Sequence, residues 1–173
     1  MIEIRPEEPP DIPAIEEVHR SAFGGEVEAR IVEAVRASAG FIPGLSLVAV
    51  EDGRVVGHAL LSPVEIRTAS SGIPALALAP VAVLPACQRR GIGSRLVEAG
   101  LRRSGELGHA IVIVVGEASF YPRFGFRPAR AKGLEAPFPV PDDAFMVLEL
   151  SPGALAGVTG TVWYPPAFLA GLD

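Results

Sequence analysis

The fold is decided by two adjacent stretches, VAVLP (residues 81–85) and QRRGIGSRLV (residues 88–97). An apolar, β-branched run stops at a proline, and a basic turn with two glycines then opens into a helical pattern. This order predicts a strand, a loop and a helix whose first backbone N–H groups face the loop, an arrangement that binds phosphate oxygens. Gly91 and Gly93 have no Cβ, so a pyrophosphate could approach the main chain closely.

Two common nucleotide-binding motifs do not fit this loop. A dinucleotide fingerprint needs a third glycine where Leu96 stands and an acidic residue near the apolar stretch 110–113. A Walker loop needs a lysine between glycine and serine, but Gly93 is followed directly by Ser94. An NAD-dependent oxidoreductase is therefore excluded, and the pattern that remains is Gln-x-x-Gly-x-Gly after a strand.

A second motif, SFYPRFGFRP (residues 119–128), follows the β-branched run Ile111–Val115, which has the pattern of a buried strand. Gly125 suits a helix C-cap with left-handed φ, after which Phe126 returns the chain to the core. The phenylalanines of this segment are best explained as packing residues. Tyr121 differs from them because its hydroxyl group adds chemistry that a phenylalanine would lack.

Together the two motifs resemble the GNAT superfamily of N-acetyltransferases, in the order and spacing of that superfamily. The sequences of residues 79–85 and 121–126 are similar to those of one GNAT branch, which consists of small, stand-alone bacterial proteins predicted to be N-acetyltransferases. The resemblance extends to the tail near residues 160–168 and is most specific between residues 79 and 128. It implies an acyl-CoA N-acyltransferase fold in which the central strands splay apart to admit the cofactor.

The pattern along the chain predicts an α/β (α+β) fold: a mixed, mostly antiparallel twisted sheet of six to seven strands flanked by helices. Strands are expected near residues 2–5, 45–50, 55–61, 73–83, 110–115 and 144–150, with a hairpin turn at Asp52-Gly53. Helices are expected from an Asp11 cap to the Gly24-Gly25 break, around residues 27–35 and over residues 91–103. We expect residues 128–142 to form a loop, and residues 1–173 to form one domain with a core in 1–150. The segment 151–173 is expected to be irregular and packed on that core.

Composition narrows the class of protein. The chain has 173 residues, a formal net charge of −5 and one cysteine, Cys87, so it has no internal disulfide. The acidic balance argues against nucleic acid as a partner, and no apolar run reaches the roughly 18 residues that would span a membrane. The three histidines show no metal-ligand spacing, and residues 1–6 lack the layout of a signal peptide. We therefore expect a cytoplasmic protein, a monomer or homodimer, without a metal.

The resemblance implies acetyl-CoA as co-substrate and the direct transfer of its acetyl group to a primary amine of a small molecule, or of a protein. The residues expected to bind the cofactor are Val81, Ala82 and Val83 of the strand, and Gln88, Arg89, Arg90, Gly91, Ile92, Gly93 and Ser94 of the loop. Tyr121 is the expected general acid that protonates the leaving thiolate. A non-catalytic module that binds or senses acyl-CoA is the alternative function.

The base that takes the proton from the amine is less defined. Glu117, just after the buried strand, is the first candidate, with Glu65, Glu26 or a water relay as alternatives. Glu26 and Glu28 are also candidate ligands of a positively charged acceptor, because an acidic cleft would attract an ammonium group.

Overall fold

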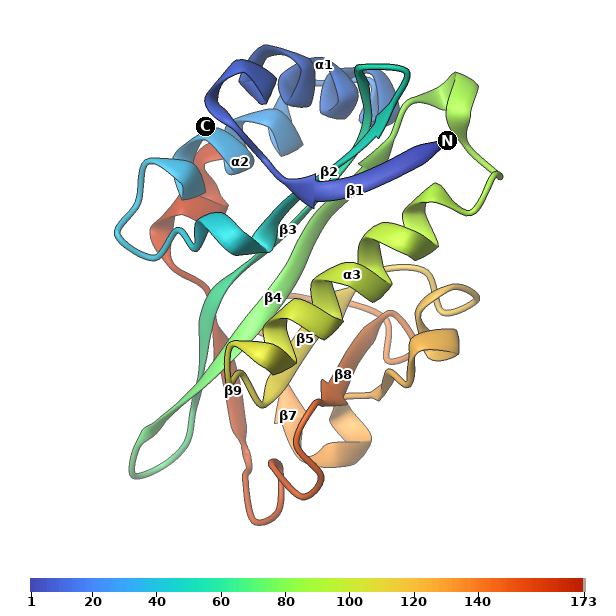
Figure 1. Ribbon diagram of the computed structural model, residues 1–173. Coiled ribbons are helices and arrows are strands. Elements are labelled where there is room, and N and C mark those ends of the chain that lie inside the picture. The colour runs from blue at the N-terminus through green and yellow to red at the C-terminus, as the bar shows by residue number, and fades with distance from the viewer. Residues whose placement is uncertain (173) are drawn as a thin grey trace. The chain divides into compact units, whose positions relative to one another are not determined.

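The computed structural model describes residues 1–172 (Figure 1). The chain forms two compact units, one made of residues 1–62, 79–103 and the segment from 166 onward, the other of residues 63–78 and 104–165. Two long strands, β3 (Arg54–Arg67) and β4 (Gly72–Val83), each run from one unit into the other. The units are described in turn.

In the first unit the strands follow the order β1-β2-β3-β4, with β1 (Ile2–Pro6) at the edge and β2 (Ser46–Glu51) between β1 and β3. Strand β2 is antiparallel to both of its neighbours. The predicted hairpin is confirmed: Glu51 pairs with Arg54 across a turn in which Asp52 and Gly53 have φ angles of 51° and 77°. Positive φ at both central residues matches the twist of the flanking strands, so this two-residue turn fixes the register of β2 against β3.

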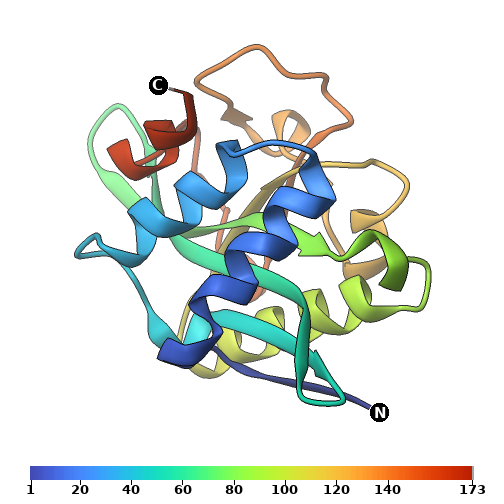
Figure 2. The ribbon, with the colours of Figure 1, turned by 90° about the horizontal axis from the view of Figure 1, so that it is seen from above.

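Helices cover both faces of these strands, as Figure 2 shows from above. They are α1 (Ile12–Phe23), α2 (Val27–Arg36) and α3 (Ile92–Glu106). Successive residues of β3 point to opposite faces: His58 contacts α1 through His19, whereas a Cβ at Gly57 would lie 3.0 Å from Leu96 of α3. A Cβ at Gly100 of α3 would lie 2.7 Å from Leu61 of β3, so the two glycines let α3 approach the sheet closely.

In the second unit the strands follow the order β4-β5-β8-β6. Strand β5 (Ile111–Val115) is antiparallel to β8 (Phe145–Glu149) along its whole length, and its first four residues are buried. Among the described residues, β5 pairs with β4 in parallel only at Leu76 with Val112 and at Ala77 with Ile113. Short strands complete the unit: β6 (Arg127–Pro128), β7 (Leu134–Glu135) and β9 (Gly160–Trp163), the last paired with both β3 and β7.

The described part of the chain also contains six 3-10 helices: η1 (Pro9–Asp11), η2 (Pro43–Leu45), η3 (Pro85–Cys87), η4 (Tyr121–Phe124), η5 (Arg130–Lys132) and η6 (Pro166–Leu172). The predicted fold class is confirmed. The described residues contain nine strands where six to seven were predicted, and three of the nine are only two to four residues long. The prediction that segment 151–173 is irregular is wrong for its described part, which contains β9 and η6. Similarly, the region 128–142 contains η5 and β7, so it is more ordered than a plain loop.

The predicted cap of α1 is also wrong. Asp11 occupies the N-cap position, but its side chain makes no capping hydrogen bond to α1. It accepts hydrogen bonds from the guanidinium of Arg5 at 2.7 and 3.1 Å and from the backbone N–H of Glu8 at 2.7 Å. The carboxylate therefore joins α1 to β1 and closes η1, where an ion pair outcompetes the local cap.

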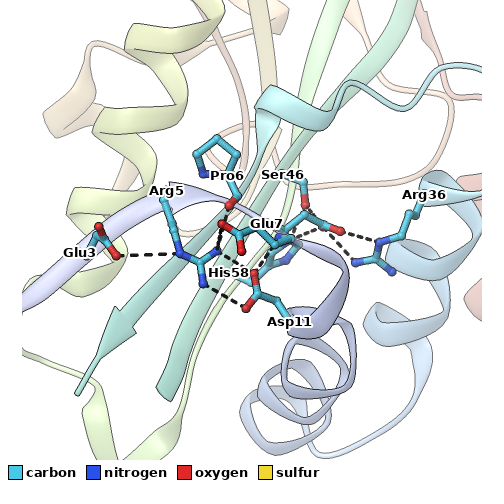
Figure 3. A network of polar contacts seen from close by, with 9 residues as sticks. Glu3, Arg5, Pro6, Glu7, Asp11, Arg36, Ser46 and His58 are labelled. Atoms are coloured by element: carbon cyan, nitrogen blue, oxygen red, sulfur yellow. Dashed lines mark hydrogen bonds and ion pairs between the residues drawn. The ribbon is translucent and has the colours of Figure 1, made fainter. Parts of the chain in front are cut away.

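At the end of β1, a polar network around Glu7 joins this strand to α2, β2 and β3 (Figure 3). Glu7, which follows β1, accepts hydrogen bonds from Arg36 of α2 at 2.8 and 3.0 Å and from the hydroxyl group of Ser46 of β2. Burial alone would raise the pKa of Glu7, but polar contacts with His58, Arg36 and Ser46 outweigh it and hold this pKa at about 2. Glu7 is therefore an ionised, buried carboxylate that fastens β1 to the unit.

The network continues from Glu7 as a chain of hydrogen bonds with one direction. An ionised carboxylate only accepts, so the Ser46 hydroxyl donates to Glu7 and its oxygen accepts from His58 Nε2 at 2.8 Å. His58 Nδ1 is then the acceptor for His19 Nε2, 2.8 Å away. This assignment leaves His19 Nδ1 without a hydrogen, as a potential acceptor. That buried atom has no hydrogen-bond partner among the described residues.

Candidate functional site

The first candidate site is the loop between β4 and α3, in the first unit. Helix α3 begins at Ile92, and the backbone N–H of Arg95 donates to the carbonyl of Gly91 at 3.1 Å. The N–H groups of the first turn have no partner within the helix, so they are available to an anion. Arg89 and Gly91 both have positive φ, 64° and 80°, and a Cβ at Gly91 would meet no atom within 4 Å. Glycine at position 91 is thus explained by its backbone conformation.

Gln88 ties this loop to the strand before it. Its side-chain Nε2 donates to the carbonyl of Val83, the last residue of β4, at 3.0 Å. Of the three strand residues expected to bind the cofactor, Ala82 is buried whereas Val81 and Val83 are partly exposed. The structure therefore brings the predicted strand and loop residues together in one continuous segment of the first unit.

The structure shows that Glu51, a residue outside this loop, contacts it, which the sequence did not indicate. Glu51, at the end of β2, holds both terminal nitrogens of the Arg90 guanidinium: Nη1 donates to Oε1 at 3.1 Å, and Nη2 bonds to Oε2. The hydrogen bond from Arg90 holds the pKa of the Glu51 carboxyl below its usual value. Glu51 and Arg90 lie 39 residues apart in the sequence, and no local pattern connects them.

The second candidate site surrounds Tyr121, in the second unit. Tyr121 begins η4 and is only 9% exposed, with the ring of Phe120 at 5.0 Å and that of Phe126 at 5.8 Å between centroids. Gly125 ends η4 in the left-handed conformation with φ 99°, as the sequence predicted, and its N–H bonds to Pro122 O at 3.0 Å. The aromatic neighbours thus hold the phenol ring in one orientation.

Gly116 makes room for this ring. A Cβ at Gly116 would lie 3.1 Å from Cδ2 of Tyr121 and closer still to its Cε2, so any side chain there would displace the ring. This role could not be predicted from the sequence, because a glycine directly after strand β5 is an ordinary strand end.

Burial, and then the negative charge of Glu117, raise the pKa of Tyr121 to about 12. The phenol is therefore fully protonated at neutral pH. Glu117 itself is exposed, and its backbone carbonyl accepts hydrogen bonds from Phe120 N–H at 3.0 Å and Tyr121 N–H at 3.3 Å. The structure thus brings Glu117 and Tyr121 together in the same turn.

Two of the remaining acidic candidates, Glu26 and Glu65, are paired with an arginine. Glu26 of the first unit, at the start of α2, binds the Arg20 guanidinium at 2.8 and 2.9 Å. Glu28 lies in the first turn of α2 and is partly exposed. Glu65, in the second unit, is 3.2 Å from Arg67, whose guanidinium lies over the ring of Trp163 at 4.2 Å. Both alternative bases, Glu26 and Glu65, are therefore already paired with an arginine.

Other kinds of site find no support in the described range. Within residues 1–172, no group of three or more His, Cys, Asp and Glu side chains is placed to hold a metal ion. None of the helices in this range is long and apolar enough to cross a membrane.

A mixed sheet with a parallel β4–β5 pair, and a glycine-containing loop that leads from β4 into α3, are features of the acyl-CoA N-acyltransferase fold. The chain belongs to the GNAT acetyltransferase family, because residues 3–129 match the family model described as an acetyltransferase (GNAT) domain.

Relatives extend this similarity over nearly the whole chain. The uncharacterized N-acetyltransferase YhbS of Escherichia coli (strain K12) is 37% identical over 166 residues, which are 95% of this chain and 97% of YhbS. The crystal structure of Escherichia coli YhbS in complex with CoA aligns with a TM-score of 0.89 and 34% identity, covering 96% of this chain and 91% of that one. A GNAT family acetyltransferase from Brucella melitensis in complex with acetyl-CoA aligns with a TM-score of 0.79 and 34% identity, covering 97% and 98% of the two chains.

Proposed function

We propose that this protein is an acetyl-CoA-dependent N-acetyltransferase that transfers the acetyl group directly to a primary amine, with residues 1–173 acting as one catalytic domain. The observation that carries the proposal is the Gln88–Ser94 loop at the start of α3, in a chain whose relatives of known structure hold CoA and acetyl-CoA. The pyrophosphate would bind the first N–H groups of α3 and the arginines Arg89 and Arg90. Strand residues Val81–Val83 would pair with the pantetheine arm as an added strand does.

Tyr121 is the proposed general acid. When the tetrahedral intermediate collapses, the thiolate leaves and needs a proton, which the phenol can donate because it is still protonated at neutral pH. The packing around the ring and the space provided by Gly116 support this role, since a proton donor must be held in one geometry.

Glu117 is the proposed base. An alkyl ammonium has a pKa of about 10.4, so the acceptor must lose a proton before it attacks. Glu117 and Tyr121 share one turn, and the carboxylate charge raises the pKa of the phenol. A carboxylate that can accept a proton, beside a phenol that can donate one, is the combination that acetyl transfer needs.

The proposed acceptor is a small primary amine with positive character. Glu28 would attract its ammonium group, and Glu26 would do so once that group replaces Arg20 as the partner of the Glu26 carboxylate. Changing Glu26→Gln together with Glu28→Gln should then raise KM for a cationic acceptor and flatten its salt dependence, with CoA affinity unchanged. An acceptor panel in which only neutral or anionic compounds react would contradict this choice of substrate.

The activity itself is tested by turnover of acetyl-CoA against a broad panel of amines, small molecules and peptide N-termini, with free thiol as the readout. We expect release of CoA that depends on one class of amine. CoA binding without turnover for every amine would instead support the non-catalytic acyl-CoA-binding module.

A further inference from the structure

The ion pair between Glu51 and Arg90 places a carboxylate of this chain on a guanidinium of the phosphate loop. Arg90 offers Nη1 and Nη2 to the two oxygens of Glu51, one pair at 3.1 Å. A phosphate group would occupy the same fork of the guanidinium, because carboxylate and phosphate share this bidentate geometry. Glu51 therefore occupies the hydrogen-bond donors that a phosphate of the cofactor would use.

We propose that Glu51 is an internal competitor for Arg90 that sets the affinity of the loop for CoA. The inference rests on the proposed function, since it assumes that the loop binds CoA phosphates. When CoA binds, Arg90 must leave Glu51 or share its charge between carboxylate and phosphate. Glu51 thus weakens CoA binding and favours release of the CoA product.

Glu51 and Arg90 differ in how strongly the surrounding structure holds them, and this difference indicates which of the two moves when CoA binds. Glu51 is the last residue of β2 and is paired on both sides, with Ile2 of β1 and Arg54 of β3. The turn that follows is held by the positive φ angles of Asp52 and Gly53. The Arg90 side chain, by contrast, is 46% exposed at the start of a loop, against 22% for Glu51. The backbone of Glu51 is therefore held in place, and the more exposed Arg90 side chain is the partner that moves between the carboxylate and the ligand.

The competition is modest because the pair is solvated. Exposed ion pairs contribute little in water, so releasing Arg90 from Glu51 should tighten CoA binding by about twofold to fivefold. The effect should shrink as salt is added, because salt screens the attraction between Glu51 and Arg90.

The test is a double-mutant cycle with CoA as the titrant in calorimetry. Glu51→Gln keeps the size of the side chain and removes its charge; it should lower the Kd for CoA by about twofold to fivefold. Arg90→Gln should weaken binding, and adding Glu51→Gln to Arg90→Gln should then bring a smaller gain than in the parent. Asp143→Asn, which removes an exposed carboxylate in the other unit, is the matched control for net charge and should leave Kd unchanged.

The outcomes separate this inference from the proposed function. If the parent does not bind CoA, the proposed function fails. If the parent binds CoA but Glu51→Gln leaves Kd unchanged or raises it, the competitor role is refuted and the proposed function stands. A gain of the same size with and without Arg90 would also overturn it, because the effect would then be general charge repulsion. Melting curves of the parent and of all four variants confirm that the proteins are folded.

Discussion

Replacing Gly116 by alanine tests whether the position of the Tyr121 ring matters for catalysis. The added Cβ would lie 3.1 Å from Tyr121 Cδ2 and closer to Cε2, inside van der Waals contact. The ring cannot retreat freely, because Phe120, Phe124 and Phe126 surround it with centroids 5.0–6.5 Å away. The phenol must therefore shift together with its aromatic neighbours.

The clash requires a shift on the order of 1 Å, and a misplacement of that size can cost roughly 10²-fold in rate. We expect kcat for acetyl transfer to fall by about that factor, with the Kd for CoA changed by less than about twofold because Gly116 lies outside the phosphate loop. The assay is steady-state release of free thiol, with calorimetry for CoA and chemical denaturation for stability.

Gly105→Ala is the control, because a Cβ at Gly105 in α3 would meet no atom within 4 Å. It should leave kcat unchanged and stabilise the helix slightly. A folded Gly116→Ala variant that turns over at the parent rate would refute the argument that the Tyr121 hydroxyl needs its present position.

Three further predictions follow from the same structure. Tyr121→Phe keeps the packing but removes the proton, so kcat should fall by about 10²–10⁴-fold while stability and CoA affinity barely move; parent-like turnover would leave Tyr121 a packing residue. Gly93→Asp puts a negative charge in the first turn of α3 and should weaken CoA binding well over tenfold by calorimetry; an unchanged Kd would exclude the loop as the phosphate site. Burial, and then the charges of His58 and Arg36, lower the pKa of His19 from 6.5 to about 3, so its contribution to stability is complete above pH 6.5 and is lost as pH falls. Urea unfolding should show about 2 kcal/mol less stability at pH 5 than at pH 8 from His19 alone, and His19→Gln should flatten this dependence.

The sequence predicted features that local chemistry determines. The Asp52-Gly53 turn and the Gly125 cap follow from backbone conformations that few residues adopt, and the structure has both. Strand β4 and helix α3 were placed to within three residues, because the proline and glycine boundaries of these elements are strong signals.

What the sequence could not predict depends on partners far along the chain. The sequence predicts Asp11 as a helix cap, but its carboxylate accepts hydrogen bonds from Arg5 and from the backbone N–H of Glu8 instead. Strand β9 was missed because a four-residue segment flanked by glycines and prolines becomes a strand only through its pairing with β3. The contact between Glu51 and Arg90 likewise depends on tertiary packing that no spacing reveals.

The one-way chain from His19 through His58 and Ser46 to Glu7 also constrains how this fold can be redesigned. Each member donates to the next, so replacing Glu7 with a neutral donor would leave two hydrogen atoms facing each other and force both imidazoles to exchange tautomers. Single substitutions at these four positions are therefore not independent, and their effects on folding should not add. Engineering that aims at an apolar interior here has to exchange the four residues, and the arginine that balances Glu7, as one block.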